Sequence, residues 1–99
     1  MRPQLKELIG KRVHFIGIGG AGMSGLARIA LSHGITVSGS DAKDSSVVIA
    51  LSALGATVST SHAAENVDGS DLVVYSNAIS QSNPERVRAQ ELNLPILTR

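Results

Sequence analysis

The sequence predicts a three-layer α/β fold, in which a parallel sheet of about four to five strands carries helices on both faces. Short apolar runs rich in Val, Ile and Leu alternate along the chain with helical segments of about ten to twelve residues. Such alternation is typical of parallel strands joined by crossover helices. The strands are expected to be apolar without a regular polar break, because both faces of the sheet are covered.

The strands are predicted from β-branched and apolar runs bounded by turn residues. We predict them over residues 13–18, 35–39, 57–59, 72–75 and 95–98. The last strand begins with Pro95, which is tolerated at the first position of a strand.

A short helix is predicted before the first strand, over residues 5–9. Further helices are predicted between the strands: from Met23 to just before Gly34, from the Ser45 or Ser46 cap to just before Gly55, and from Pro84 to about Leu92. Gly34 and Gly55 stand where a glycine typically ends a helix. Ser45 or Ser46 is expected to cap the helix that follows. Asn83-Pro84 is expected to form the N-cap and first turn of the last helix, since proline there loses no hydrogen bond.

Length and composition restrict the class of protein. The 99 residues suit one domain over 1–99, with a core built from aliphatic residues because only Phe15 and Tyr75 are aromatic. A formal net charge of +1 is too balanced for a nucleic-acid-binding protein. No apolar run is long enough to span a membrane and no secretory signal is recognisable, so we expect a cytoplasmic protein. The absence of cysteine excludes disulfides, thiolate metal sites and cysteine catalysis.

The most specific motif is Gly17-Ile18-Gly19-Gly20-Ala21-Gly22, a G-x-G-x-x-G segment between a predicted strand and a predicted helix. In this pattern the first glycine permits a tight turn, the second lets backbone approach a phosphate, and the third lets helix and strand pack closely. The N–H groups and the dipole of the following helix favour an anion. We therefore predict a phosphate-binding loop; the alternative is a glycine-rich turn without a ligand.

Asp41 follows the second predicted strand, nineteen residues after Gly22. This is close to the spacing of about twenty residues at which a carboxylate reads a ribose hydroxyl in dinucleotide-binding folds. The alternative is a loop or capping aspartate, although Asp44 and Ser45 are the more natural caps for the next helix.

Further polar residues follow the predicted strands at the edge where ligands bind in parallel sheets. Ser76-Asn77-Ala78-Ile79 follows the strand over 72–75, and it either faces the ligand or is a strand-to-helix loop chosen for turn chemistry. Among the three histidines, His62 alone lies in a predicted ligand-side loop. His14 is predicted at a packing or edge position of the first strand, and His33 at a helix C-terminus, where a cation suits the dipole.

Several catalytic signatures are missing from the sequence. It contains neither a G-x-x-x-x-G-K-[ST] loop nor a G-x-S-x-G elbow. No histidine pair has metal-ligand spacing, and no carboxylate pair is expected at the ligand edge for acid–base work. We therefore expect no catalytic residue and no metal site in this chain.

The motifs, taken in order, resemble the N-terminal part of the Mur ligases. The first is the segment from His14 to Ala27, which contains the glycine loop. The others are Val37-Ser38-Gly39-Ser40-Asp41, His62 with Glu65-Asn66-Val67, Tyr75-Ser76-Asn77-Ala78-Ile79, and Asn83-Pro84-Glu85. The resemblance covers nearly the whole chain, from about Val13 to Arg99.

The resemblance implies a Rossmann-like N-terminal domain that binds the UDP part of the substrate in a three-domain enzyme. Among the family, the motifs are most similar to those of the member that joins L-alanine to UDP-N-acetylmuramate, using ATP and magnesium, in cytoplasmic peptidoglycan synthesis. The central ATPase and C-terminal domains would be absent here. The family's Gly-Thr-His-Gly-Lys-Thr loop is expected beyond Arg99, so the chain alone is expected to be inactive.

The resemblance also implies a UDP site. Backbone amides from Gly19 to Met23 would meet the diphosphate, and Asp41 with Ser40 would meet the uridine. His62 would lie near the ribose or uracil, and the loop from Ser76 would line the phosphate side. The expected UDP-binding residues are Gly17, Gly19, Gly20, Ala21, Gly22, Met23, Ser40, Asp41, His62, Ser76, Asn77 and Ala78.

Two other functions remain open on the sequence. A small NAD-binding regulatory module of an ion-transport protein would share the glycine loop and the acidic residue, but 99 residues supply little beyond one mononucleotide-binding half. A related ligase that acts on recycled muropeptides would share the N-terminal motifs.

Overall fold

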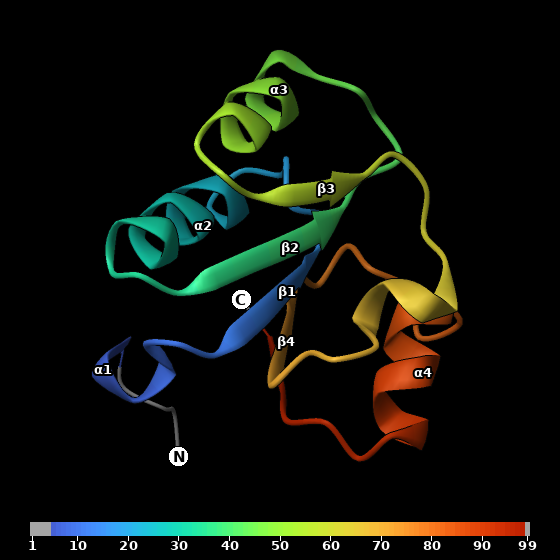
Figure 1. The fold of residues 1–99 in the computed structure, drawn as a ribbon. Helices are drawn as coiled ribbons and strands as arrows, with labels where there is room; N and C mark the ends of the chain where they lie inside the picture. The colour runs from blue at the N-terminus through green and yellow to red at the C-terminus, as the bar shows by residue number, and fades with distance from the viewer. Residues whose placement is uncertain (1–4, 99) are drawn as a thin grey trace.

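The computed structural model describes residues 5–98, which contain one parallel β-sheet. Its strands are β1 (Arg12–Ile16), β2 (Thr36–Ser40), β3 (Thr57–Ser59), β4 (Leu72–Tyr75) and β5 (Ile96–Thr98). Their order across the sheet is β3-β2-β1-β4-β5, so β1 is central and each neighbouring pair runs parallel (Figure 1).

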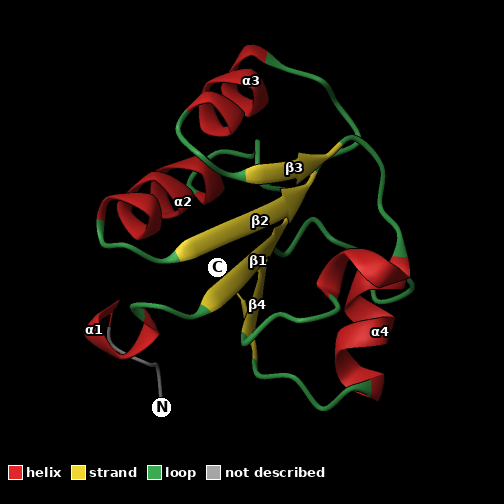
Figure 2. Cartoon of the chain, viewed as in Figure 1, coloured by secondary structure: helices red, strands yellow, loops and turns green. Residues whose placement is uncertain are grey.

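Helices lie on both faces of the sheet; α1 precedes β1, and the others connect successive strands (Figure 2). They are α1 (Leu5–Leu8), α2 (Met23–Ser32), α3 (Ser46–Ala53), the 3₁₀ helix η1 (Ala64–Val67) and α4 (Pro84–Glu91). α2 and α3 lie against β1, β2 and β3 on one face, whereas η1 and α4 pack together on the other. The predicted three-layer α/β class with a parallel sheet is confirmed.

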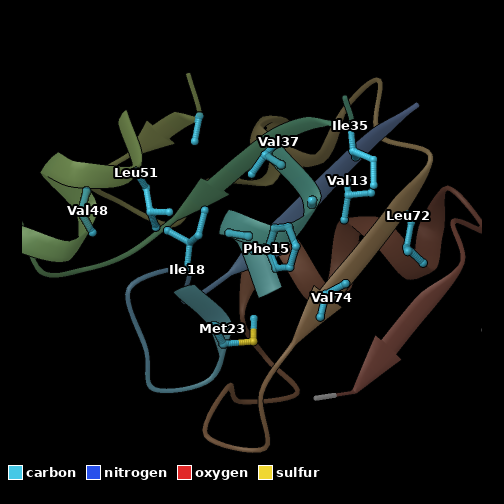
Figure 3. Close-up of a cluster of buried hydrophobic side chains, with 13 residues drawn as sticks. Val13, Phe15, Ile18, Met23, Ile35, Val37, Val48, Leu51, Leu72 and Val74 are labelled. Atoms are coloured by element: carbon cyan, nitrogen blue, oxygen red, sulfur yellow. The ribbon is translucent and has the colours of Figure 1, made fainter. Parts of the chain in front are cut away.

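The two faces of the sheet carry different interiors because side chains alternate along each strand. Val13 and Phe15 of β1 join the large apolar core beneath α2 and α3, which Figure 3 shows. Ile16 points to the opposite face and packs with Val67 and Ala89 in a smaller core. His14 shares that opposite face with Ser38 and Ser40, so the face is polar where it meets β2.

Gly39 explains how the loop after β1 packs so tightly on β2. A Cβ on Gly39 would lie 2.6 Å from Cδ1 of Ile18 and 2.9 Å from the Phe15 carbonyl oxygen. Any side chain there would displace Ile18, which is fully buried. The sequence placed Gly39 in a strand without indicating this close approach.

The element bounds differ from the predicted ones by one or two residues. β1 ends at Ile16 rather than at residue 18, because Gly17 turns the chain with φ +80°. β2 extends to Ser40, which pairs with Ile16. β5 begins at Ile96 rather than at Pro95, and η1 was not predicted.

The predicted helix caps are confirmed where they are described. Gly34 and Gly55 follow helix C-caps with φ +76° and +113°. Ser45 rather than Ser46 is the N-cap of α3, and Asn83 caps α4 ahead of Pro84. Within residues 5–98 no helix has the length and apolar character needed to cross a membrane.

Candidate functional site

The carboxyl ends of the strands bring the predicted site residues to one edge of the sheet. In the strand register Ile16 pairs with Ser40 of β2 and with Tyr75 of β4, and Ser40 pairs with Ser59 of β3. The loops that follow these four strands therefore begin side by side. They carry the glycine segment, Asp41, His62 and the segment from Ser76.

The glycine segment folds as the tight turn that the motif predicts. The N–H groups of Gly17 and Ile18 donate to the Ser40 carbonyl at 2.8 and 3.0 Å. Gly17 and Gly22 both adopt positive φ, at +80° and +79°, where a side chain would be strained. Gly22 occupies the N-cap position of α2 but has no side chain that could accept a hydrogen bond from the first amides of the helix.

Only some amides of this loop are available to a ligand. The N–H of Gly20 donates to the Gly17 carbonyl at 3.0 Å, and the N–H of Met23 donates to the Gly20 carbonyl at 3.1 Å. The Met23 side chain is buried in the core beneath α2. Within residues 5–98 the N–H groups of Ala21 and Gly22 have no acceptor. The loop thus offers two adjacent donors at the positive end of α2.

Asp41 holds this loop in place. Its Oδ2 accepts a hydrogen bond from the Gly19 N–H at 2.9 Å, and its Oδ1 accepts one from the Lys43 N–H at 3.0 Å. Asp41 does not cap α3, because Ser45 accepts from Val48 N at 3.3 Å and serves as the cap. Of the two caps predicted for this helix, Asp44 and Ser45, the structure uses Ser45.

Gly19 is required by its neighbours inside the protein. A Cβ at this position would lie 2.9 Å from Oδ2 of Asp41 and 3.1 Å from Cγ2 of Val48. The second glycine of the motif therefore lets the loop approach Asp41 and α3, a constraint that the sequence did not reveal.

The segment after β4 lies against the glycine loop. A Cβ on Gly17 would be 3.3 Å from Cδ1 of Ile79, so the two loops are in contact. The Ile79 N–H closes a turn onto the Ser76 carbonyl at 3.0 Å. Arg86 of α4 donates to the Ile79 carbonyl at 3.0 Å and lies 4.2 Å from the centroid of the Tyr75 ring. Ser76 is half-buried beside this turn, whereas Asn77 and Ala78 are exposed.

A buried carboxylate lies behind this edge. Glu85, the second residue of α4, has a side chain that is 0% exposed. Its Oε1 accepts from Nε2 of His14 at 2.5 Å and from Oγ of Ser40 at 2.8 Å. Its Oε2 accepts from the Ala63 N–H and from Nδ2 of Asn66, both at 3.1 Å. One carboxylate thus joins α4, β1, β2 and the loop before η1.

The partners of Glu85 keep it ionised. Burial acts to raise the pKa of the carboxyl group, but hydrogen bonds from His14, Ser40 and Asn66, together with an electrostatic contribution from His14, outweigh it. The pKa of Glu85 therefore lies below its ordinary value of 4.5. An ionised carboxylate only accepts hydrogen bonds, which suits a site surrounded by donors.

The two histidines beside Glu85 have different environments. His14 is 1% exposed in the central strand, where Nδ1 lies 2.8 Å from Oγ of Ser38, so it is a buried packing position and not an edge position. His62 is 23% exposed, and its Nδ1 lies 2.8 Å from Oγ of Ser40 and 3.3 Å from Oε2 of Glu85. Of the two, His62 is the one that a ligand can reach.

Comparison with known proteins shows the family. The family model described as "Mur ligase family, catalytic domain" matches residues 12–99. The chain belongs to the Mur ligase family. The curated UDP-N-acetylmuramate–L-alanine ligase of Thermobifida fusca is 59% identical over 88 residues, which is 89% of this chain and 19% of that protein. The chain therefore spans about a fifth of the length of such relatives.

Solved structures of Mur ligases share the fold. The UDP-N-acetylmuramate–alanine ligase of Thermotoga maritima superposes with a TM-score of 0.86 at 38% identity, over 90% of this chain and 21% of that chain. The UDP-N-acetylmuramate:L-alanyl-gamma-D-glutamyl-meso-diaminopimelate ligase of Neisseria meningitides gives 0.81 at 36% identity, over 89% and 28%.

Sequence reasoning on this Mur ligase domain missed the role of Glu85. An acidic residue in the first turn of a helix is normally explained by the helix dipole, so Glu85 needed no other explanation. Its partner His14 lies 71 residues away in the sequence, so no local pattern links the two. A signal was present in β1 and β2, where His14, Ser38 and Ser40 occupy alternate positions that point to one face. Polar residues on a covered face require buried partners, and Glu85 is that partner.

Proposed function

We propose that residues 1–99 are the UDP-binding domain of a Mur ligase that adds L-alanine to UDP-N-acetylmuramate. The observation that carries this proposal is the 59% identity, over 89% of the chain, to a relative named UDP-N-acetylmuramate–L-alanine ligase. The open glycine loop at the ligand edge of the sheet supports it, because such loops suit a diphosphate.

The diphosphate is assigned to the start of α2. The N–H groups of Ala21 and Gly22 donate to no acceptor within residues 5–98, and the helix dipole adds a partial positive charge. Gly17, Gly19, Gly20 and Met23 contribute by shaping the loop, since the N–H groups of all four already have acceptors. Ser76, Asn77 and Ala78 form the neighbouring wall on the phosphate side.

The uridine is assigned to the residues that follow β2 and β3. The Asp41 carboxylate accepts two backbone hydrogen bonds and retains lone pairs for ribose hydroxyls. Ser40 is fully buried and acts by holding His62, whose ring is partly exposed at the same edge. His62 is therefore the second candidate for contact with the nucleoside.

ATP and magnesium are assigned to the parts of the proposed enzyme outside residues 1–99. The sequence has no loop with the phosphate-binding lysine, and residues 5–98 contain no group of three His, Cys, Asp or Glu side chains suited to a metal ion. In the proposed enzyme ATP, magnesium and L-alanine bind to other domains, and amide-bond formation takes place there; we propose a cytoplasmic location for it. The present chain binds the UDP end of the substrate.

The muropeptide-recycling ligase is the closer of the two alternatives. Among the solved structures, the Neisseria meningitides enzyme matches at 36% identity and the Thermotoga maritima alanine ligase at 38%. A NAD-binding regulatory module is disfavoured by the match of residues 12–99 to the Mur ligase family.

The proposal is tested by titration calorimetry of the 99-residue chain with UDP, UDP-N-acetylmuramate, NAD and ATP. We expect saturable binding of the two uridine nucleotides and much weaker binding of the other two. Tighter binding of NAD than of UDP would contradict the proposal. Recycling specificity is tested separately in the whole enzyme, by comparing L-alanine with the free tripeptide L-alanyl-gamma-D-glutamyl-meso-diaminopimelate as the amine that is joined to UDP-N-acetylmuramate.

A further inference from the structure

The hydroxyl of Ser40 lies between a carboxylate and an imidazole. Its Oγ is 2.8 Å from Oε1 of Glu85 and 2.8 Å from Nδ1 of His62. Ionised Glu85 has no proton to give, so the single proton of the Ser40 hydroxyl is donated to Oε1. The Ser40 oxygen is then left as an acceptor toward His62.

The direction of the Ser40 hydrogen bond also determines which nitrogen of His62 carries the proton. Nδ1 of His62 faces two acceptors, Oγ of Ser40 at 2.8 Å and Oε2 of Glu85 at 3.3 Å. Unless Nδ1 carries a proton, three lone pairs would face one another with no hydrogen between them. The neutral ring must therefore be the Nδ1–H tautomer, which leaves Nε2 without a proton.

Nε2 is the part of His62 that remains for a ligand. The side chain is 23% exposed, and within residues 5–98 Nε2 has no hydrogen-bond partner. His62 follows β3, whose last residue, Ser59, accepts a hydrogen bond from the Asp41 N–H, so His62 belongs to the edge of the sheet where the Asp41 and glycine loops begin. An unprotonated imidazole nitrogen accepts hydrogen bonds and does not donate them.

We propose that Glu85 and Ser40 are positioning residues that hold neutral His62 in its Nδ1–H tautomer, so that Nε2 accepts a hydrogen bond from an N–H or O–H group of the bound nucleoside. The inference rests on the proposed function, which supplies uridine as the ligand. Uridine offers such donors at its ribose hydroxyls and at the imide N–H of its base. His62 thus selects for a donor on the ligand.

The tautomer is measured without any ligand. A long-range ¹H–¹⁵N correlation spectrum of the histidine side chains is recorded at about pH 8, where neutral imidazole predominates, and His62 is assigned with the His62→Gln variant. We expect the shift pattern of a protonated Nδ1 and a bare Nε2. A predominant Nε2–H tautomer would overturn the inference and leave UDP binding untouched.

Two variants test the positioning role. Ser40→Ala removes the acceptor that faces Nδ1, and Glu85→Gln replaces the carboxylate with an amide that also donates. Both are expected to move His62 toward the Nε2–H tautomer. The matched control is Ser38→Ala, which loses only the contacts to His14 and Arg12. An equal change in the Ser38→Ala variant would show general loosening and contradict the proposal.

The ligand's donor is identified with UDP analogues. We compare UDP with its N3-methyl, 2′-deoxy and 3′-deoxy forms, each of which lacks one donor. The wild type should bind at least one analogue about two- to tenfold more weakly, and His62→Ala should bind that analogue and UDP equally. Equal binding of all four by the wild type would refute the acceptor role while UDP binding stands. Failure of UDP itself to bind would contradict the proposed function and this ligand role together.

Discussion

The carboxylate of Glu85 lies 2.5 Å from Nε2 of His14, which joins the first turn of α4 to the middle of the central strand. Both side chains are almost completely buried, at 0% and 1% exposure. Asn83 caps α4 by accepting from the Glu85 N–H at 2.9 Å, which leaves the side chain to turn inward toward the sheet. The Glu85 carboxylate thus connects α4 to the edge of the sheet where the ligand is expected to bind.

Loss of this carboxylate should destabilise the fold strongly. Glu85→Ala leaves His14, Ser40 and Asn66 without their common acceptor in a buried site, and breaking such a buried pair costs about 3–5 kcal/mol. The matched control is Glu91→Ala at the exposed end of the same helix, expected to change stability by less than about 0.5 kcal/mol. Urea denaturation of both variants gives the two free energies of unfolding. Similar values for them would show that the Glu85 cluster contributes little.

The same residue makes stability depend on pH. The pKa of Glu85 in the folded chain lies below its ordinary value of 4.5, so the unfolded chain binds more protons at acid pH. The stabilisation is therefore fully present above the ordinary value and is lost as the pH falls through the folded pKa. The free energy of unfolding, measured from roughly pH 3 to 7, should fall more steeply in the wild type than in Glu85→Gln. Parallel curves would contradict this role.

Two glycine substitutions should act in opposite directions. Gly19→Ala places a methyl group 2.9 Å from Asp41 and 3.1 Å from Val48, and overpacking of this kind costs about 1–3 kcal/mol. Gly25→Ala in α2 meets nothing within 4 Å, and an alanine there stabilises a helix by about 0.8–1 kcal/mol. Thermal unfolding of the two variants measures both effects. A destabilised Gly25→Ala would contradict the open surroundings described for this position of α2. A stabilised Gly19→Ala would contradict the described packing of the glycine loop.

Substitution of Asp41 should lower the affinity of the chain for UDP. Asp41→Ala removes a carboxylate assigned to a ribose hydroxyl and releases the Gly19 and Lys43 amides, so UDP affinity should fall about tenfold or more. Asp44→Ala is the control, since it removes an equal charge from an exposed position of the same loop. Calorimetric titration with UDP compares the two. If both variants bind UDP as the wild type does, Asp41 is not part of the site.

The fold followed from local sequence signals to a large extent. Strands and helix caps are determined by a few neighbouring residues, so hydrophobic pattern and turn chemistry suffice to predict them. Examples are the strand over 72–75 and the caps at Gly34, Ser45 and Asn83. The bounds of β1 shifted because the first glycine of the motif turns the chain immediately. η1 has no such local signal, because its position depends on packing against α4.

The candidate site was predictable only as a set of loops at one edge. The motif indicated a phosphate-binding loop, and the resemblance to the Mur ligases implied that backbone amides from Gly19 to Met23 meet the diphosphate. Which of these amides are already bonded depends on Asp41 and on the turn itself. The Glu85 centre joins segments that are far apart in the chain, and its hydrogen bonds depend on the tertiary structure. Residue type and spacing do not carry that information.

The central claim is that a uridine diphosphate is held by the free amides at the start of α2. It is tested most directly by following the backbone amide resonances of the ¹⁵N-labelled chain during titration with UDP. Saturable shifts that are largest at Ala21 and Gly22, with smaller shifts in the loops after β2 and β4, are the predicted result. Saturable binding that leaves Ala21 and Gly22 unchanged, or no binding at millimolar UDP, would contradict the account.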